Sequence, residues 1–215
     1  MPRIFILLAV VCLFFTPAHA WAAGVFGVVD FVPDGDTVVF ESGEVVRMIG
    51  IDAPETGKDG QPDQYFAADS RDALKRLTLG ERVEARLVGP ERDRHGRLLG
   101  VVLLPDGRNA NELQLLGGLA YYYHFQDHPG WLESTYMGLQ RSAIRSGAGF
   151  WPKILSLPVA EKPWVGYPNR RAEPARGCRV GAEKSGLKWF DNLEQVLING
   201  YAPVRKYSPW SGVRD

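Results

Sequence analysis

The chain has 215 residues, of which 45% are hydrophobic and 23% are charged, the balance of a folded globular protein rather than a disordered one. This length allows one ordinary domain with a tail or a small second module. The formal net charge is zero, but acidic residues are in excess between Gly24 and Pro152 and basic residues from Lys153 onward. The neutral total weakens the case for a binder of polyanions without excluding one, because the charge is not uniform.

The first twenty residues have the pattern of a secretory signal peptide. Arg3 precedes the apolar run Ile4–Phe15, which is followed by Pro17 and by Ala18-His19-Ala20, a cleavage-site pattern with a small residue on each side of His19. The apolar run is shorter than the roughly 18 residues of a membrane-spanning helix, so a retained anchor is the weaker interpretation. We expect residues 1–20 to be cleaved, and the mature protein to be a secreted or periplasmic monomer without stable membrane association.

Residues 25–51 are predicted to form three successive strands. The segments Val25–Val32, Thr37–Phe40 and Val45–Ile51 are apolar and rich in β-branched residues. The residues between them are turn formers. This stretch therefore predicts a β-meander.

The next segments alternate between helical and strand patterns. A helix is predicted up to Gly80 from apolar residues at helical spacing, namely Phe66, Ala73, Leu74 and Leu77. Strands follow over 83–87 and 98–104, with a turn at 93–96. Asn109 and Glu112 have the spacing of a capping box for a second helix, and a third helical pattern ends at Gly147.

This order of elements predicts an α+β fold, a five-stranded OB-type β-barrel with helices and a small C-terminal α/β addition. The core domain is expected at 24–152. Residues 153–175 are rich in proline and charge and lack periodicity, so we expect a linker there. A small C-terminal module is expected at 176–215, with a helix around Leu193–Leu197.

Two acidic turns flank the second and third predicted strands. Asp34–Thr37, taken alone, is typical of a hairpin turn. In Asp52–Glu55, Pro54 favours an extended Ala53 whose carbonyl points away from the sheet. Carboxylate and carbonyl oxygens are the ligands that Ca²⁺ and Mg²⁺ prefer, and one end of the meander could bring both turns together. The alternative is a proline-containing turn with solvated acidic side chains.

Arg47 interrupts an apolar strand, and a buried lone charge there would cost several kcal/mol or more. It is either an edge-strand arginine that faces water, a partner in a core salt bridge with an Asp, or part of a polar pocket. Arg47 and Asp52 are an odd number of residues apart, so a regular strand would put them on opposite faces. They can share a site only if the strand ends or bulges near Gly50.

Phosphodiester cleavage would use a pair of arginines, because charge builds on the nonbridging oxygens as water adds to phosphorus. Arg97 follows a polar turn that, as a lone motif, is a solvated hairpin turn. Together with Arg47 it offers bidentate donors that lysine lacks. Glu55 is the candidate that orients or deprotonates the attacking water. The aromatic run Tyr121–Phe125 offers rings for base stacking, although core packing is expected to take at least half of them.

These motifs, in this order, resemble those of the staphylococcal nuclease (thermonuclease) family. The resemblance covers about Val25 to Trp151 and is carried by five stretches: 32–38, 47–55, 93–100, 109–120 and 149–151. It implies an OB barrel that hydrolyses DNA and RNA with Ca²⁺, although Mg²⁺ or another divalent ion is left open.

The resemblance also implies a role for each matched residue. Asp36, Asp52 and the Ala53 carbonyl would be metal ligands, Glu55 the candidate base, and Arg47 and Arg97 the groups that bind the phosphate and stabilise the transition state. The departures lie at the substrate contacts, where Arg94 and His95 replace a lysine and an aromatic residue and His124 replaces a stacking tyrosine.

The C-terminal module resembles a decayed copy of a small Cys-rich zinc module. Loss of Cys12 with the signal segment leaves Cys178 as the only cysteine, so the mature chain forms no internal disulfide. A single thiol cannot make a four-ligand site, so no zinc is predicted. A simple helical addition that packs, or that binds a polyanion through Arg205 and Lys206, is preferred.

The sequence therefore predicts an exported, calcium-dependent nuclease. The alternative is a non-catalytic OB-fold module that binds nucleic acid or protein. None of Arg47, Glu55 and Arg97 has been lost, which favours the enzyme.

Overall fold

The computed structural model describes residues 24–57, 60–125, 129–175 and 186–211. The predicted signal segment and Cys178 lie outside these residues, so the predictions of cleavage and of an absent zinc site stay predictions. Within the described residues, no helix has the length and apolar character needed to span a membrane.

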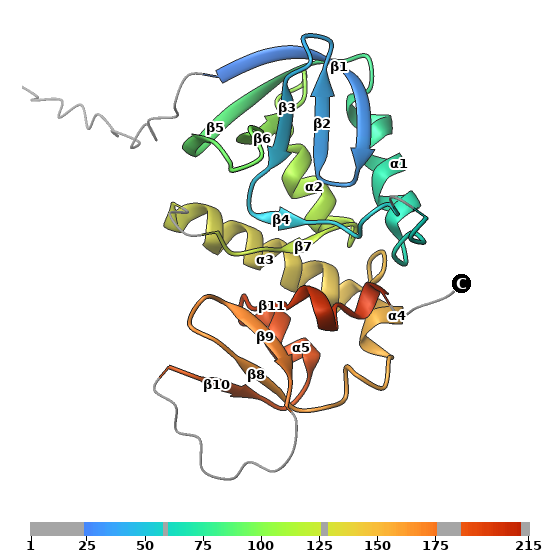
Figure 1. The fold of residues 1–215 in the computed structure, drawn as a ribbon, viewed down its shortest axis with the longest axis vertical. Coiled ribbons are helices and arrows are strands. Elements are labelled where there is room, and N and C mark those ends of the chain that lie inside the picture. Colours follow the sequence, from blue (N-terminus) through green and yellow to red (C-terminus); the bar gives the residue numbers. More distant parts are fainter. Residues whose placement is uncertain (1–23, 58–59, 126–128, 176–185, 212–215) are drawn as a thin grey trace, which may run out of the picture.

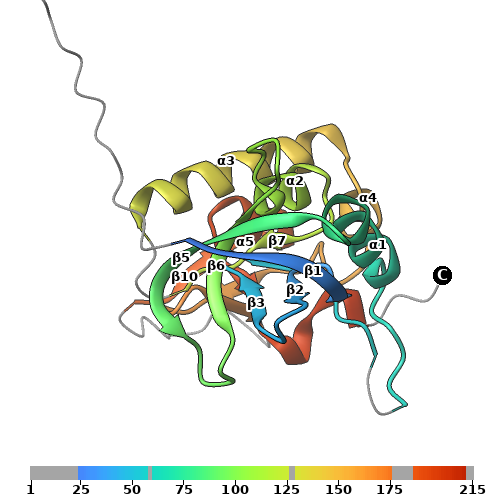
Figure 2. The same cartoon turned by 90° about the horizontal axis from the view of Figure 1, so that it is seen from above.

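Five strands close into a barrel in the order β1-β2-β3-β6-β5 (Figures 1 and 2). They are β1 (Gly24–Asp34), β2 (Thr37–Phe40), β3 (Val45–Met48), β5 (Arg82–Arg92) and β6 (Leu98–Leu103). The β3–β6 pair is parallel and the other pairs are antiparallel. The interior is filled by apolar side chains from every strand, among them Val29, Val38, Val46, Val83 and Val101. The predicted fold class is confirmed.

The prediction of one strand over Val45–Ile51 is wrong at its C-terminal end, because the structure divides this segment into two strands. β3 stops at Met48, Gly50 has φ +79°, and the two-residue strand β4 (Ile51–Asp52) pairs with β7 (Tyr121–Tyr122) instead of the barrel. A positive φ suits glycine, and a Cβ at Gly50 would also collide with Leu132 and Tyr136. This break removes the alternation that would have put Arg47 and Asp52 on opposite faces.

Helices cover the barrel at one end and continue into the C-terminal region. They are α1 (Ala67–Thr78), α2 (Ala110–Leu116), α3 (Gly130–Ser146), α4 (Trp151–Leu155) and α5 (Leu193–Ile198). The predicted cap of α2 is present, since the Asn109 side chain accepts from the backbone amides of Asn111 and Glu112. The predicted end of α3 is also present, with Gly147 left-handed at φ +65°.

The structure places strands in the segment that was expected to be a linker. β8 (Trp164–Gly166) and β9 (Arg171–Pro174) join β10 (Lys188–Phe190) and β11 (Ala202–Pro203) in a four-stranded sheet. β8 and β9 pair with each other across the turn at 167–170, whereas their other partners, β10 and β11, lie further along the chain. Strands of this length are too short for a period of two to stand out in the sequence. Two 3₁₀ turns, η1 (Arg205–Tyr207) and η2 (Pro209–Ser211), follow β11.

A second hydrophobic core joins this sheet to the helices. α3 lies between the barrel and the C-terminal sheet in Figure 1. Trp151, Trp164 and Trp210 are all fully buried in this core. Gln140 on α3 links the two sides, because its Oε1 accepts from the Tyr122 amide at 2.6 Å and its Nε2 donates to the Leu197 carbonyl at 2.7 Å. The C-terminal region is thus packed against the helices below the barrel.

Candidate active site

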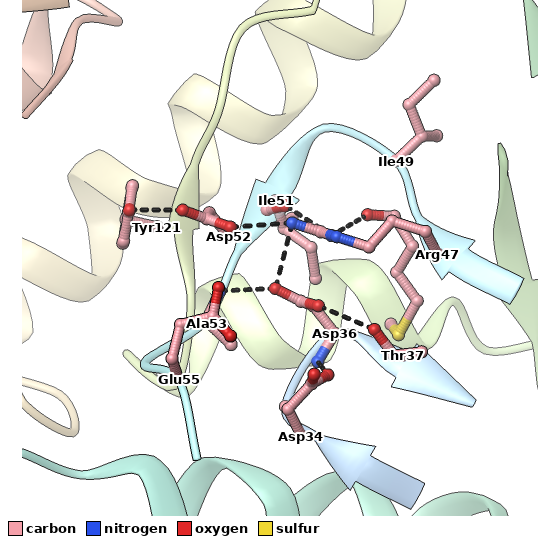
Figure 3. A network of polar contacts seen from close by, with 12 residues as sticks. Asp34, Asp36, Thr37, Arg47, Ile49, Ile51, Asp52, Ala53, Glu55 and Tyr121 are labelled. Carbon is pink, nitrogen blue, oxygen red and sulfur yellow. Dashed lines mark hydrogen bonds and ion pairs between the residues drawn. The ribbon is translucent and has the colours of Figure 1, made fainter. Parts of the chain in front are cut away.

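Asp36 occupies the turn between β1 and β2 and is buried, with 5% of its surface exposed. Its Oδ2 accepts a hydrogen bond from the Ala53 amide at 2.7 Å, and its Oδ1 accepts one from Thr37 Oγ1 at 3.1 Å. The turn comes close to α1, because a Cβ at Gly35 would collide with the Ser70 side chain. The two acidic turns predicted from the sequence therefore meet directly (Figure 3).

Arg47 lies between the two acidic turns, and both of its terminal nitrogens are engaged. Nη1 donates to the carbonyls of Met48 and Ile51, at 2.7 and 2.9 Å. Nη2 lies 3.1 Å from Asp36 Oδ2 and 2.8 Å from Asp52 Oδ1. Burial lowers the pKa of Arg47, but the two carboxylates raise it on balance, so the guanidinium stays charged. Of the alternatives for this arginine, the salt bridge with nearby aspartates is the one observed.

Asp52 is held at both of its carboxylate oxygens. Oδ1 accepts from Arg47, and Oδ2 accepts from the hydroxyl of Tyr121 on β7 at 2.5 Å. Burial, followed by the carboxylate of Asp52, raises the pKa of Tyr121 well above its usual value, so the phenol is the donor. In the sequence, Tyr121 is only one of several rings available for packing or stacking, and no local signal points to this contact.

Glu55 lies in the loop that follows Asp52, and its side chain is half-exposed. Its Oε1 lies 3.2 Å from Nη2 of Arg205, which comes from the C-terminal turn η1. Its backbone amide donates to Gln64 Oε1 at 3.0 Å. Burial raises the pKa of Glu55, as does the carboxylate of Asp52, while Arg205 lowers it in part. The C-terminal addition was expected either to pack only or to bind a polyanion through Arg205 and Lys206, and the structure places Arg205 beside this carboxylate.

Negative charge is in excess around Asp36. Burial raises the pKa of Asp36 well above its usual range, the Arg47 guanidinium opposes this only in part, and the carboxylates of Asp34 and Asp52 add to the rise. The oxygen atoms present are those of a site for a hard cation, and a divalent ion would relieve the excess charge.

In the described part of the chain, no three His, Cys, Asp or Glu side chains are grouped as a metal cluster. The coordination of an ion between Asp36 and Asp52 would therefore have to be completed by a carbonyl such as that of Ala53 and by water.

Arg97 stands at the start of β6, next to the strand that carries Arg47. Its Nε and Nη2 bind Asp93 Oδ2 at 2.9 and 2.8 Å. Among the described residues, the structure shows no contact of Arg97 with Asp36, Asp52 or Glu55, so it is not part of the network in Figure 3. Arg94 and His95 lie exposed on the same turn and contact each other at 3.1 Å.

The aromatic run Tyr121–Phe125 is partly buried and partly exposed. Tyr121 and Tyr122 are buried, whereas Tyr123, His124 and Phe125 are partly exposed. The Arg171 guanidinium lies over the Tyr123 ring, 3.5 Å from the ring centroid. Tyr122 Oη lies 3.3 Å from His124 Nδ1. Burial lowers the pKa of His124. Core packing was expected to take at least half of these rings, but only two of the five residues of the run, Tyr121 and Tyr122, are buried.

Comparison with known proteins gives one family and several relatives. Residues 45–153 match the family described as "Staphylococcal nuclease homologue". The chain is 34% identical over 167 residues to a micrococcal nuclease of Shigella flexneri, covering 73% of this chain and 86% of that protein. It is 33% identical over 146 residues to an uncharacterized endonuclease of Escherichia coli O157:H7, covering 66% and 85%. It is 37% identical over 76 residues to a thermonuclease of Staphylococcus hyicus, covering 34% and 45%.

The family match runs from β3 into α4. It contains Arg47, Asp52, Glu55 and Arg97, whereas Asp36 lies ahead of it in the chain. The contact of Asp36 with Arg47 ties this residue to the matched region.

Proposed function

Since the chain belongs to the staphylococcal nuclease family and is a nuclease of the endonuclease type, we propose that it hydrolyses phosphodiester bonds of DNA or RNA at a Ca²⁺ site held by Asp36 and Asp52. One observation carries this proposal, namely that two acidic turns and Arg47 converge at one end of the barrel. The non-catalytic alternative would bind nucleic acid and leave it intact.

The cation would be held by the carboxylates of Asp36 and Asp52 and by the Ala53 carbonyl. When bound there, it would polarise the phosphoryl group and neutralise part of its charge. Support for this placement comes from the oxygen-only donors and from the geometry, in which the two carboxylates of Asp36 and Asp52 share the single guanidinium of Arg47. Ca²⁺ is preferred to Mg²⁺ because it tolerates an irregular set of carboxylates, carbonyls and waters.

The side chains of this protein would then divide the reaction among them. Glu55 orients the attacking water and takes its proton, while the water oxygen forms a bond to phosphorus and the bond to the leaving oxygen breaks. Arg47 exchanges a carboxylate contact for a phosphate oxygen, and Arg97 donates from the neighbouring strand. Arg94 and His95, exposed on the turn before Arg97, would contact the substrate beside the cleaved bond.

We also propose that the protein acts outside the cytoplasm, as a monomer. The pattern of a charged residue, an apolar run and small residues at 1–20 supports export. A weak Ca²⁺ site would be filled where this ion is abundant. N-terminal sequencing of the exported protein tests the cleavage, and an intact Met1 on that protein would contradict it.

Activity is tested by release of acid-soluble nucleotides from DNA and from RNA, with Ca²⁺, with Mg²⁺ and with a chelator. We expect release with Ca²⁺ and none with the chelator. Equal release in both would contradict the metal-dependent mechanism. Binding of nucleic acid without cleavage under every condition would favour the non-catalytic alternative.

A further inference from the structure

The Asp52 carboxylate accepts hydrogen bonds from a residue of the barrel and from a residue outside it. Arg47, on barrel strand β3, donates to one carboxylate oxygen, and the Tyr121 hydroxyl on β7 donates to the other at 2.5 Å. The backbones of Asp52 and Tyr121 are also directly paired across β4 and β7. The carboxylate therefore has both its position and its rotation fixed by two different parts of the fold.

The Tyr121 ring is in turn held by the C-terminal end of the chain. The Trp210 ring stacks on it, with the centroids 4.6 Å apart and the planes 18° from parallel. Trp210 is 1% exposed, and Phe150 meets it edge-on at 5.1 Å. The carbonyl of Trp210 accepts from the Tyr65 amide at 3.0 Å, so the backbone of this turn is anchored too.

The same C-terminal stretch reaches the second acidic residue of the site. Arg205 pairs with Glu55 at 3.2 Å, and Ser211 Oγ accepts from Gln64 Nε2 at 3.0 Å. Gln64 itself accepts from the Glu55 amide. Residues 205–211 thus contact the loop that follows β4 at two points, Glu55 and Gln64.

We propose that Tyr121 and Trp210 are positioning residues for Asp52, so that the C-terminal segment 205–211 is part of the cleavage site. The proposal rests on the proposed function, in which Asp52 is a metal ligand. A carboxylate that is already hydrogen-bonded in its binding orientation loses less freedom when it takes up an ion, and loss of such outer contacts weakens metal affinity about 10–100-fold. Trp210 acts through the ring that it stacks on.

The competing explanation is that Tyr121 only fills the core. Tyr121→Phe separates the two explanations, because it removes the hydroxyl and leaves the ring and its stack on Trp210. The matched control is Tyr167→Phe, which removes a hydroxyl that donates to a different carboxylate, Glu173 Oε1, at 2.7 Å.

The experiment measures the Ca²⁺ dissociation constant of the full mature protein by calorimetry, alongside kcat, KM and thermal unfolding. We expect Tyr121→Phe to weaken Ca²⁺ binding about 10–100-fold and to lower kcat more than it raises KM. Tyr167→Phe is expected to keep the wild-type dissociation constant. Wild-type Ca²⁺ affinity in Tyr121→Phe would overturn the proposal.

Trp210 is tested with two substitutions. Trp210→Phe keeps a stacking ring and is expected to keep Ca²⁺ affinity, whereas Trp210→Ala is expected to weaken it as much as Tyr121→Phe does. If Trp210→Ala does not fold, the Ca²⁺ dissociation constants of Tyr121→Phe and Trp210→Phe still test the proposal. A Trp210→Phe protein that binds Ca²⁺ as weakly as Tyr121→Phe would contradict the stacking role.

Asp52→Asn separates failure of this inference from failure of the proposed function. Unchanged Ca²⁺ affinity in Asp52→Asn overturns the metal site itself, and the inference with it. Lost affinity in Asp52→Asn together with wild-type affinity in Tyr121→Phe overturns the inference alone. When each single substitution weakens Ca²⁺ binding, adding Tyr121→Phe to Asp52→Asn is expected to cause no further loss of Ca²⁺ affinity. A double variant whose loss of affinity equals the two single losses combined would show that Tyr121 acts elsewhere than on Asp52.

Discussion

Arg47 and Asp36 form a buried ion pair, with Arg47 Nη2 3.1 Å from Asp36 Oδ2 and each residue less than a tenth exposed. The same guanidinium also binds Asp52 and two backbone carbonyls. One side chain therefore satisfies groups from β3, from the β1–β2 turn and from the loop at Gly50. Its loss would affect folding and chemistry together.

Arg47→Met should destabilise the protein by about 3–5 kcal/mol, because it leaves buried carboxylates without their cation. Urea unfolding at neutral pH measures the change. The control is Arg108→Met, which removes an arginine from an exposed pair with Asp106 and should change stability by no more than about 0.5 kcal/mol. Equal effects of the two substitutions would contradict a structural role for the buried pair.

Glu55→Gln should lower kcat by about 10²–10⁴-fold, because an amide cannot take a proton from water. The half-exposed side chain and its single ion pair predict little change in unfolding free energy. Steady-state hydrolysis and urea unfolding are measured on the same preparation. Glu44→Gln, at another exposed ion pair, is the control. Full activity in Glu55→Gln would remove Glu55 from the mechanism.

Arg97→Ala should lower kcat/KM by about 10²–10³-fold, as expected for a donor to the phosphate in the transition state. Arg94→Ala, on the same exposed turn, should raise KM with little change in kcat if Arg94 contacts the substrate outside the reacting group, as we propose. Kinetics on a defined oligonucleotide distinguish the two. Equal kinetic parameters for both variants would indicate that Arg97 only binds substrate.

Asp93 should make the protein more stable at neutral than at acid pH. Burial alone raises the pKa of Asp93, but hydrogen bonds from the side chain and amide of Arg97 and from the His95 amide lower it on balance. A carboxyl group whose pKa is lowered on folding stabilises the fold above its unfolded pKa of about 3.9, and this stability is lost as the pH falls through the folded value.

Asp93→Asn should therefore unfold more easily than the wild type at about pH 7, and equally easily at an acid pH at which the Asp93 carboxyl is protonated in the folded as well as the unfolded state. Urea titrations at both pH values measure the difference. Asp30→Asn, at an exposed residue of β1, is the control for a general effect of removing an aspartate. A difference between Asp93→Asn and wild type that persists unchanged at acid pH would contradict the ion-pair explanation.

Arg205→Ala should alter catalysis while stability stays within about 0.5 kcal/mol of the wild type, because the pair with Glu55 is exposed. Arg205 lowers the pKa of Glu55, so its removal raises that pKa. A base must be deprotonated to act, and the acid limb of the pH–kcat/KM profile should therefore move to higher pH. Lys206→Ala removes the same charge from the neighbouring residue and should leave this limb in place. A shift of equal size in both variants would assign the effect to net charge.

The sequence by itself determined the barrel, its helices and the residues at its acidic end. Alternating and helical spacing are local properties, and Asp34–Thr37 and Asp52–Glu55 mark their turns by residue type alone, so these elements could be predicted. The odd separation of Arg47 and Asp52 also indicated that these two residues could share a site only if the strand ended or bulged near Gly50, where φ is +79°.

Only the tertiary structure decided how those residues are held. The strands β8 and β9 are three and four residues long and form a local hairpin, while the strands that flank this hairpin, β10 and β11, are distant in the chain. The hydroxyl of Tyr121 meets Asp52 across 69 residues, and Arg205 meets Glu55 across 150. Such contacts arise from packing of separate elements into shared cores, and no spacing within one segment encodes them. For this reason the C-terminal residues, expected from sequence to be peripheral, lie beside the acidic loop.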